Sequence, residues 1–233
     1  MISEAMILSG GMGTRLKDTV PELPKVMAPV AGHPFIYYLI KNLEKKGIKH
    51  FTFLLGYKHN VVSSYLDDAF KNLVKTYVVE SMPLGTGGAI QNGLQYCKKE
   101  TVAITNGDTY FDIDLNKMEF LHTQKVSNCT LALKPMKNYD RYGSVLFDQD
   151  FLITDFIEKK YTNEGYINGG FYLIDKNSFL KHSFEKVFSF EKDYLENETL
   201  NKKMYATLHD SYFIDIGIPE DYSKAQNEMK NLL

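Results

Sequence analysis

The feature that most constrains the fold is a short apolar run that leads directly into a glycine-rich turn near the N-terminus. Residues 5–8 read Ala-Met-Ile-Leu and predict a buried strand. Three glycines follow this run: Gly10, Gly11 and Gly13. Because glycine lacks a Cβ atom, backbone N–H groups there can approach an anion closely. Thr14 and Arg15 are expected to begin a helical turn whose free amides and dipole favour phosphate. The pattern therefore predicts a strand that ends in a phosphate-binding loop.

A lysine in a proline-bounded segment follows the glycine loop. Lys25 lies between Pro24 and Pro29, whose rings stiffen the chain that carries this charge. Alone, the glycines are common in tight connections, and they fit neither the Gly-x-Gly-x-x-Gly dinucleotide motif nor a Walker loop. Arg15 and Arg141 are the two arginines among 27 basic residues. Arginine in a lysine-rich chain indicates a need for a planar, bidentate cation, although chance substitution explains Arg141 equally well.

Length and composition limit the class of protein. A chain of 233 residues with 44% hydrophobic content can bury a full core as one α/β domain, or as one domain with a closely apposed lobe. A net charge of −2 gives no general field for nucleic acid, and we expect no such partner. The apolar runs are strand-sized, so no membrane span or leader is expected. Cys97 and Cys129 form no metal-ligand spacing, which favours a reduced, cytoplasmic compartment.

The first half of the chain alternates between strand and helix patterns. Strands are expected at 51–55, 77–79 and 102–105, and helices at 35–43, 60–70 and 88–97. This alternation predicts an α/β fold with a Rossmann-like, mostly parallel sheet sandwiched by helices. Ligands of such sheets bind beyond the carboxyl ends of the strands. The glycine loop, Glu80 and Asp108 all follow predicted strands and are therefore expected at one edge.

After about residue 112 the alternation loosens. Strand-like segments at 129–133, 143–147, 151–157 and 165–174 predict a smaller mixed lobe that faces the first half. A final helix is expected over 219–233, with Pro219 in its first turn. We therefore expect residues 1–233 to form a single domain, with a nucleotide-binding half (1–112) and a sugar-binding half that includes the C-terminal helix (113–233).

Taken together, Gly-Gly-x-Gly-Thr-Arg-Leu and the downstream Pro-Lys-x-x-x-Pro-Val resemble the signature of the sugar-1-phosphate nucleotidyltransferases. The resemblance implies transfer of a nucleotidyl group from a nucleoside triphosphate to a sugar 1-phosphate, with Arg15 and Lys25 as catalytic cations. It also implies that the loop binds the nucleotide through Leu8, Ser9, Gly10, Gly11, Gly13 and Thr14. Unlike family members with a C-terminal parallel β-helix, the chain is expected to hold the catalytic core alone.

The segment from Glu80 to Gly88 resembles the base-recognition loop of the family. The expected nucleotide-binding residues of this segment are Glu80, which would contact the base, and Pro83, Gly85 and Thr86. An ionised carboxylate only accepts hydrogen bonds, and guanine offers two adjacent donors that it can take bidentately. Uracil and thymine offer one donor, for which glutamine is better suited. GTP is therefore the expected nucleotide. The alternative is a uridylyltransferase or another nucleotidyltransferase acting on a hexose or amino-sugar 1-phosphate, since some uridylyltransferases also carry glutamate here.

Two aspartates resemble the metal ligands of the family. Asp108 closes an Asn-Gly-Asp that follows an apolar strand, and Asp215 begins Asp-Ile-Gly-Ile-Pro-Glu-Asp. Alone, an Asn-Gly-Asp sequence is usually a turn. Mg²⁺ binds hard oxygen ligands and commonly takes one or two carboxylates together with substrate phosphates. The resemblance therefore implies Mg²⁺ as the cofactor, held by Asp108 and Asp215.

Segments in the second half resemble the sugar site of the family. The residues implied to bind the sugar phosphate are Asn106, Tyr142, Gly143, Glu158, Lys159, Asn168 and Gly169. Each alone fits a turn or a surface charge, so the expectation depends on their order and spacing. Lys160 stands where the family usually has proline after Glu-Lys, which leaves the local loop geometry open.

Within the family, the runs at 22–30, 56–59 and 83–90 are most similar to the D-glycero-D-manno-heptose 1-phosphate guanylyltransferases. The expected identity of the sugar rests on this similarity alone, which implies a GDP-heptose for surface polysaccharide synthesis. Two other classes remain open: a glycosyltransferase that uses Asp112-Ile113-Asp114 as an Asp-x-Asp metal motif, and a non-catalytic subunit that senses nucleotide sugars. The sequence leaves a homo-oligomer open.

Overall fold

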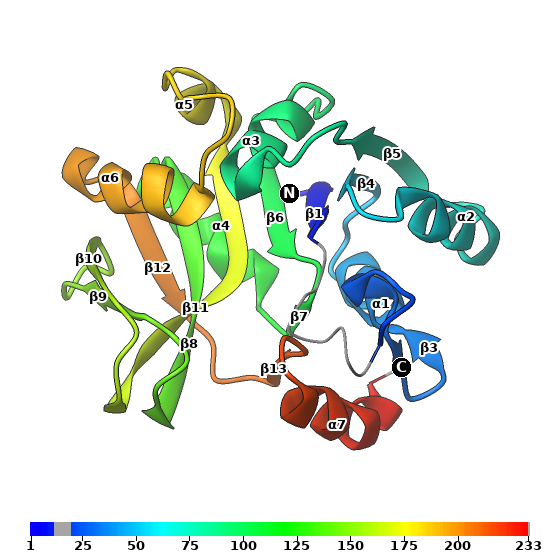
Figure 1. The fold of residues 1–233 in the computed structure, drawn as a ribbon. Coiled ribbons are helices and arrows are strands. Elements are labelled where there is room, and N and C mark those ends of the chain that lie inside the picture. The colour runs from blue at the N-terminus through cyan, green and yellow to red at the C-terminus, as the bar shows by residue number, and fades with distance from the viewer. Residues whose placement is uncertain (12–19, 233) are drawn as a thin grey trace.

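A computed structural model describes residues 1–11 and 20–232 of the chain. Its centre is a nine-stranded sheet, within which four strands run parallel (Figure 1). In spatial order these four are β6 (Thr101–Asn106), β1 (Glu4–Ser9), β4 (His50–Leu55) and β5 (Val74–Val79). Parallel strands need crossover connections, which the helices between them provide. Their carboxyl ends therefore lie at one edge of the sheet, as the sequence predicted.

The second half of the chain extends the same sheet through one long strand. β11 (Thr162–Asp175) runs antiparallel to β6 and carries the remaining strands on its other side. These are β8 (Cys129–Tyr139), β9 (Ser144–Phe147), β10 (Ile153–Ile157) and β12 (Met204–Leu208). The pairing of β11 with β8 shifts register between Asn168 and Tyr172, which marks a bulge beside the site described below. The predicted fold class, a mostly parallel central sheet flanked by helices, is confirmed.

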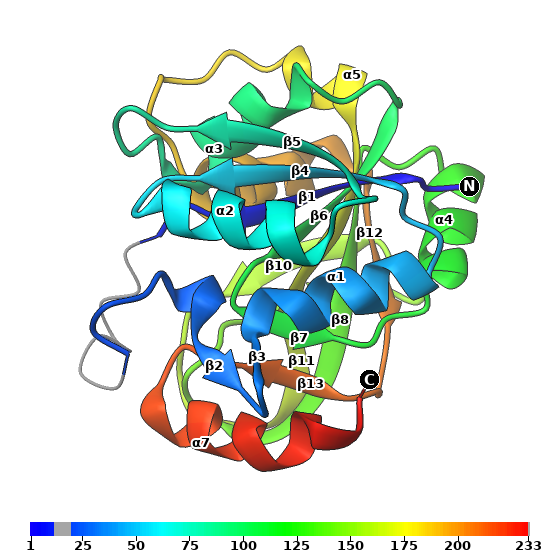
Figure 2. The ribbon, with the colours of Figure 1, turned by 90° about the vertical axis from the view of Figure 1, so that its right-hand side faces the viewer.

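Helices cover both faces of the parallel strands, because alternate strand residues point to opposite sides. On one side, Ile7 and Phe53 pack with α1 (Phe35–Lys45) and α2 (His59–Ala69). On the other side, Met6 and Leu54 pack with α3 (Gly85–Leu94). Figure 2 shows α2 in front of the parallel strands and α3 behind them. The two faces thus form two separate hydrophobic clusters.

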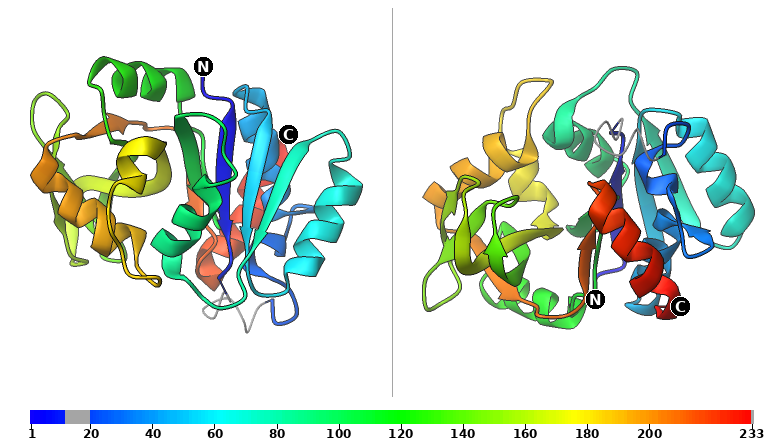
Figure 3. Two further views of the ribbon diagram at one scale, coloured as in Figure 1. Left: turned by 90° about the horizontal axis from the view of Figure 1, so that it is seen from above. Right: turned by 60° about the horizontal axis from the view of Figure 1, so that its bottom comes forward.

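The C-terminal segment packs against the N-terminal half. β13 (Phe213–Asp215) pairs antiparallel with β7 (Thr109–Phe111), and α7 (Pro219–Glu228) follows directly. Figure 3 shows α7 beside these strands and close to α1. The Gln226 amide donates to the Pro29 carbonyl at 2.6 Å and thereby joins α7 to the short hairpin of β2 (Pro29–Val30) and β3 (His33–Pro34). These contacts hold β13 and α7 against the N-terminal half of the chain.

Several elements differ from the sequence expectation. The helix predicted at 88–97 spans Gly85–Leu94, and the final helix ends at Glu228 before a 3-10 turn, Met229–Asn231. Sequence reasoning missed α4 (Leu115–Gln124), whose apolar residues are too few for clear periodicity. Other short elements are η2 (Lys25–Met27), α5 (Lys176–Leu180), the π-helix η3 (Phe190–Leu195), α6 (Glu196–Glu198) and η4 (Thr199–Asn201). The helical turn expected at Thr14 and Arg15 lies outside the described residues.

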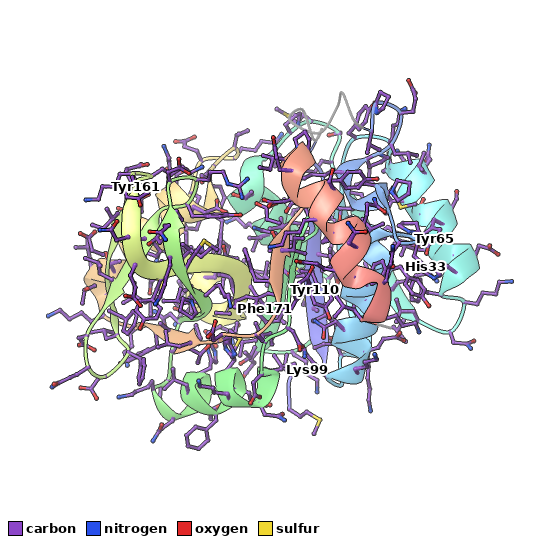
Figure 4. The ribbon with its side chains drawn as sticks, turned by 90° about the horizontal axis from the view of Figure 1, so that it is seen from below. His33, Tyr65, Lys99, Tyr110, Tyr161 and Phe171 are labelled. Carbon is purple, nitrogen blue, oxygen red and sulfur yellow. The ribbon has the colours of Figure 1, made fainter. Side chains whose placement is uncertain are left out.

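Aromatic side chains mark the interior and the rim of the molecule. Tyr110 and Phe171 are buried, and Figure 4 places both near the middle of the molecule, whereas Tyr161 lies at its far end. Tyr161 is 65% exposed in the turn between β10 and β11.

In the described part of the chain, none of the helices has the length and apolar character needed to cross a membrane.

Candidate active site

The loop after β1 lies at the carboxyl edge of the sheet. The Leu8 carbonyl accepts a hydrogen bond from the Gly107 N–H at 2.9 Å, which ties the end of β1 to the turn after β6. The Gly10 carbonyl accepts a longer bond, 3.4 Å, from the Tyr57 N–H after β4. Leu8, Ser9, Gly10 and Gly11 line one wall of a cavity of about 430 Å³. Gly13, Thr14 and Arg15 lie outside the described residues.

Glu80 faces this cavity from the end of β5. Its N–H donates to the Leu55 carbonyl at 2.9 Å, and its Oε2 accepts from the Leu84 N–H at 3.3 Å. Burial raises the pKa of the Glu80 carboxyl, and the hydrogen bond from Leu84 partly opposes that rise. Pro83, Gly85 and Thr86 line the same cavity. The structure therefore gathers the predicted base loop and the described part of the glycine loop around one space.

A second cavity of about 390 Å³ adjoins the first. Four of the described residues line both cavities: Asn106, Asp108, Glu191 and Gly217. The second cavity is also lined by Tyr142, Gly143, Lys159, Asn168 and Gly169 from the predicted sugar site. A molecule in one cavity can therefore meet a molecule in the other at this shared wall.

Two aspartates and a lysine lie close together near the wall that the two cavities share. Asp215 ends β13 opposite Thr109 of β7, which brings it beside Asp108. The Lys25 ammonium donates to Asp108 Oδ2 at 2.5 Å and lies 3.7 Å from Asp215 Oδ1. The Lys25 side chain is only 10% exposed. The cation is thus held between two carboxylates at the junction of the two cavities.

These residues have the chemistry of a magnesium site. Within the described ranges there is no group of three or more acidic, histidine or cysteine residues that could hold a metal. Mg²⁺ does not require one, because it usually takes one or two carboxylates and completes its shell with water and substrate phosphates. Gly217 leaves the necessary room, since a Cβ atom there would lie 2.9 Å from Asp215 Oδ1 and 3.1 Å from Lys25 Nζ. The Asp108 and Asp215 carboxylates fit the ion by number and type.

The remaining residues predicted to bind the sugar phosphate differ in their contacts and in their exposure. The Asn168 amide donates to the Tyr172 hydroxyl at 2.9 Å and accepts from the Gly170 N–H at 3.0 Å, so it shapes the bulge that borders the second cavity. Lys159 is exposed at the rim, whereas its neighbour Glu158 is exposed and absent from the described lining of both cavities.

Packing alone accounts for two of the glycines in this region. A Cβ atom on Gly143 would lie 2.7 Å from the Ile157 carbonyl oxygen, and one on Gly169 would lie 2.9 Å from that of Ala132. Real Cβ atoms do not approach carbonyl oxygens so closely. Glycine is therefore required at both positions by neighbouring strands, independently of any contact with a sugar.

Sequence reasoning missed Glu191, which lines both cavities. Its carboxylate accepts hydrogen bonds from the hydroxyls of Thr86 at 2.8 Å and Ser189 at 3.2 Å. Thr86 also accepts from the Phe190 N–H, so α3 and η3 hold each other in place. Glu191 lies on a π-helix, a geometry frequent at functional sites, but no spacing in the sequence predicts that helix.

An ion pair closes the outer side of the second cavity. The Arg141 guanidinium donates to Asp221 of α7 at 2.5 Å, and both residues line the cavity. The pairing gives the second arginine of the chain a specific contact. Asp221 was visible in the sequence only as an acidic residue of a first helical turn, where it would equally suit the helix dipole.

The Asp-x-Asp segment has structural partners instead. Asp112 pairs with Lys46 at 2.6 Å, and Asp114 Oδ1 accepts from the Lys117 N–H at 3.0 Å as the N-cap of α4. In the described part of the chain, neither aspartate lines the two cavities. The geometry thus gives no support to a metal motif at Asp112 and Asp114.

Comparison with known proteins shows similarity over nearly the whole chain. The chain is 46% identical over 230 residues to a D-glycero-alpha-D-manno-heptose 1-phosphate guanylyltransferase of Aneurinibacillus thermoaerophilus, covering 99% of this chain and 100% of that protein. It is 43% identical over 219 residues to the protein of the same name from Campylobacter jejuni, covering 94% and 96%. The crystal structure of HddC from Yersinia pseudotuberculosis complexed with GMP-PN superposes with a TM-score of 0.85 at 36% identity, covering 98% of this chain and 100% of that one. The nucleotidyl transferase family matches residues 4–231, and the chain belongs to that family.

Proposed function

We propose that the protein transfers the guanylyl group of GTP to D-glycero-α-D-manno-heptose 1-phosphate, giving a GDP-heptose and pyrophosphate. The observation that carries the proposal is the pair of adjoining cavities with Asp108 in their shared wall. The names of two relatives, similar over nearly their whole length, support the choice of nucleotide and sugar. The product would serve surface polysaccharide synthesis, and the enzyme would act in the cytoplasm, where GTP is available.

In this proposal the first cavity binds GTP. Glu80 accepts hydrogen bonds from the guanine N1–H and 2-amino groups, while Pro83, Gly85 and Thr86 form the surface around the base. The backbone of Ser9, Gly10 and Gly11 approaches the phosphates, and we propose that Gly13, Thr14 and Arg15 also bind the nucleotide. Glu191, held by Thr86, borders both substrates and offers acceptor oxygens to sugar hydroxyls.

The second cavity binds the sugar phosphate. Lys159 at the rim supplies a positive charge, Asn168 and Tyr142 supply polar groups, and Asn106 lies at the wall shared with the nucleotide. Glu158 would contribute only by turning inward from its exposed position. The sugar's anomeric phosphate then faces the α-phosphate of GTP across Asp108.

The reaction is an in-line displacement at phosphorus. An oxygen of the sugar phosphate attacks the α-phosphorus, an oxygen–phosphorus bond forms, and the bond to pyrophosphate breaks. Arg15 and Lys25 stabilise the negative charge that grows on the phosphates, and the residues that line the two cavities align the two substrates. When bound by Asp108 and Asp215, Mg²⁺ supplies further charge neutralisation at the phosphates. No covalent intermediate on the protein is needed, because the sugar phosphate is itself the nucleophile.

A single assay tests the proposal. The protein is incubated with GTP or UTP, Mg²⁺ and one of a panel of sugar 1-phosphates, including the heptose, mannose and glucose compounds, and pyrophosphate release is measured. We expect release with GTP and the heptose 1-phosphate at the highest kcat/KM. Preference for UTP with a hexose would support the uridylyltransferase alternative. Absence of release with every acceptor would support a sensing subunit or a glycosyltransferase.

A further inference from the structure

The Lys25 ammonium lies where the proposed function also places a divalent cation and the phosphates of the nucleotide. Lys25 lines the first cavity, Asp215 lines the second, and Asp108 lines both. Nζ of Lys25 lies 2.5 Å from Asp108 Oδ2 and 3.7 Å from Asp215 Oδ1. We refer to Asp108 and Asp215 as the aspartate pair. Its carboxylates come from the turn after β6 and from β13, far apart in the chain, and the lysine comes from η2.

The ammonium and a divalent cation compete for the same oxygens. Mg²⁺ binds carboxylate oxygens at about 2.1 Å, so an ion on Asp108 Oδ2 would lie within a few ångströms of the Lys25 ammonium. Two cations that close repel strongly in a partly buried site. The contact as it stands therefore occupies Asp108 Oδ2, an oxygen that a metal on the aspartate pair would also use, and places a positive charge beside the position of that metal.

We propose that Lys25 is the built-in counter-ion of the aspartate pair, and that it exchanges with the divalent cation when nucleotide phosphates enter the first cavity. The inference rests on the proposed nucleotidyl transfer and its metal site. Lys25 holds the two carboxylates together until the metal replaces it. Its ammonium then turns on its four-carbon stem toward the phosphates, which lie in the cavity that it already lines.

The exchange links two binding events. Without nucleotide, the metal must displace an ammonium whose carboxylate partners in the described part of the chain are Asp108 and Asp215 themselves. With nucleotide, the phosphates accept both the metal and the displaced ammonium. Metal and nucleotide therefore bind cooperatively, and by linkage each increases the affinity for the other by the same factor. Arg141, whose charge also acts on Asp215, is held by Asp221 and remains in place during the exchange.

The test measures Mn²⁺ binding directly, without turnover. Free Mn²⁺ is followed by electron paramagnetic resonance during titration of the wild type, Lys25→Met and the control Lys46→Met. Lys46 pairs with Asp112 at 2.6 Å, so the control removes a similar ion pair away from both cavities. We expect Lys25→Met to bind Mn²⁺ about 5- to 150-fold more tightly than the wild type, the usual range of a coupling between two ligands. Lys46→Met should bind as the wild type does.

Two further arms make the result specific. In Lys25→Met/Asp108→Asn the gain in Mn²⁺ affinity should disappear, which assigns it to the aspartate pair. In the wild type, a non-hydrolysable GTP analogue should strengthen Mn²⁺ binding, and this cooperativity should shrink in Lys25→Met. Lys25→Gln, which keeps a donor for Asp108 but no charge, replaces Lys25→Met if the latter unfolds, as judged by thermal melting.

The opposite outcomes overturn the inference. If the uncharged variants bind Mn²⁺ no better than the wild type, or not at all, the ammonium does not compete with the metal. If the nucleotide effect on Mn²⁺ is unchanged in those variants, Lys25 does not link the two ligands. Either result is independent of the proposed activity, because a wild-type protein that releases pyrophosphate from GTP and the heptose 1-phosphate would still support that activity.

Discussion

Gly217 donates its backbone N–H to Asp215 Oδ1 at 2.7 Å, and a Cβ atom at the same residue would lie only 2.9 Å from that oxygen. The glycine thus orients the carboxylate and at the same time leaves space in front of it. Gly217→Ala should therefore displace the Asp215 carboxylate while leaving the core intact. We expect turnover to fall by about tenfold or more, as for a catalytic group displaced by about an ångström. The measurement is kcat with GTP and Mg²⁺, with thermal melting as the folding control. Unchanged kcat in a folded variant would contradict this role.

The aspartate pair itself predicts a metal-dependent loss. Asp108→Asn and Asp215→Asn keep the size of each side chain but remove the charge that a hard cation needs. We expect each variant to require more Mg²⁺ for half-maximal rate, and we expect EDTA to abolish activity in the wild type. The check is a Mg²⁺ titration of the rate at fixed GTP. A variant with the wild-type Mg²⁺ dependence would identify its aspartate as structural.

The Asp-x-Asp segment should behave in the opposite way. Asp114→Ala removes the N-cap of α4 and should lower the free energy of unfolding by about 1 kcal/mol, the usual value of such a cap. Asp112→Asn should weaken only a partly exposed ion pair with Lys46 and change stability little. Neither substitution should alter the Mg²⁺ dependence of the rate. Loss of Mg²⁺ dependence in the Asp112→Asn or Asp114→Ala variant would support the glycosyltransferase alternative.

The sequence predicted the parallel half of the fold because its strands and helices are local patterns. The strand at 51–55 and the helix at 35–43 lie within β4 and α1, since buried strands and amphipathic helices carry their own periodicity. The family was also predicted correctly, from the ordered pair of N-terminal motifs. The sequence could not predict that β11 joins the second half to β6, because strand pairing over such a separation leaves no local signal.

The candidate site likewise contains residues that local sequence patterns could place and contacts that they could not. The position of Asp108 and Glu80 at one edge of the sheet could be predicted because each follows a predicted strand, and parallel strands end at one edge. Glu191 was missed because its position depends on η3 packing against Thr86 of α3, a contact between residues more than a hundred positions apart. The contact between Lys25 and Asp108 was also beyond sequence reasoning, which could assign both to phosphate chemistry but could not place them in contact.

Buried histidines predict a loss of stability in mild acid. Burial lowers the pKa of His122 from 6.5 to about 4, and burial likewise lowers the pKa of His209 to about 4. Below pH 6.5 the unfolded chain takes up protons at these residues, whereas the folded chain does not until about pH 4. The contribution of the two uncharged histidines to the free energy of unfolding is therefore complete above pH 6.5. It is lost progressively as the pH falls toward 4. His122→Gln should reduce the drop in melting temperature between pH 7 and pH 5, with His209 accounting for the part that remains. Parallel curves for the two proteins would contradict the assignment.

The position of Glu80 predicts the choice of base. If its carboxylate takes both donors of guanine, ITP, which lacks the 2-amino group, should lose about 1.5 to 3 kcal/mol, the value of one hydrogen bond to a charged group. That loss corresponds to about 13- to 160-fold in kcat/KM. Glu80→Gln should also lose its preference for GTP, because an amide presents a single acceptor oxygen to two donors.

Acidity should act on the same contact. Because burial raises the pKa of the Glu80 carboxyl, it takes up a proton at a higher pH than an exposed glutamate does. A protonated carboxyl no longer accepts bidentately, so the preference for GTP over ITP should decline as the pH falls, and Glu80→Gln should show no such decline. The measurement is the ratio of kcat/KM for GTP and ITP at several pH values in both proteins, with UTP as a third substrate. Comparing two purine nucleotides cancels the titration of the triphosphate and of other site residues. Equal use of GTP and ITP by the wild type at neutral pH would exclude the bidentate contact, and a preference for UTP would assign the chain to the uridylyl-transferring members of its family.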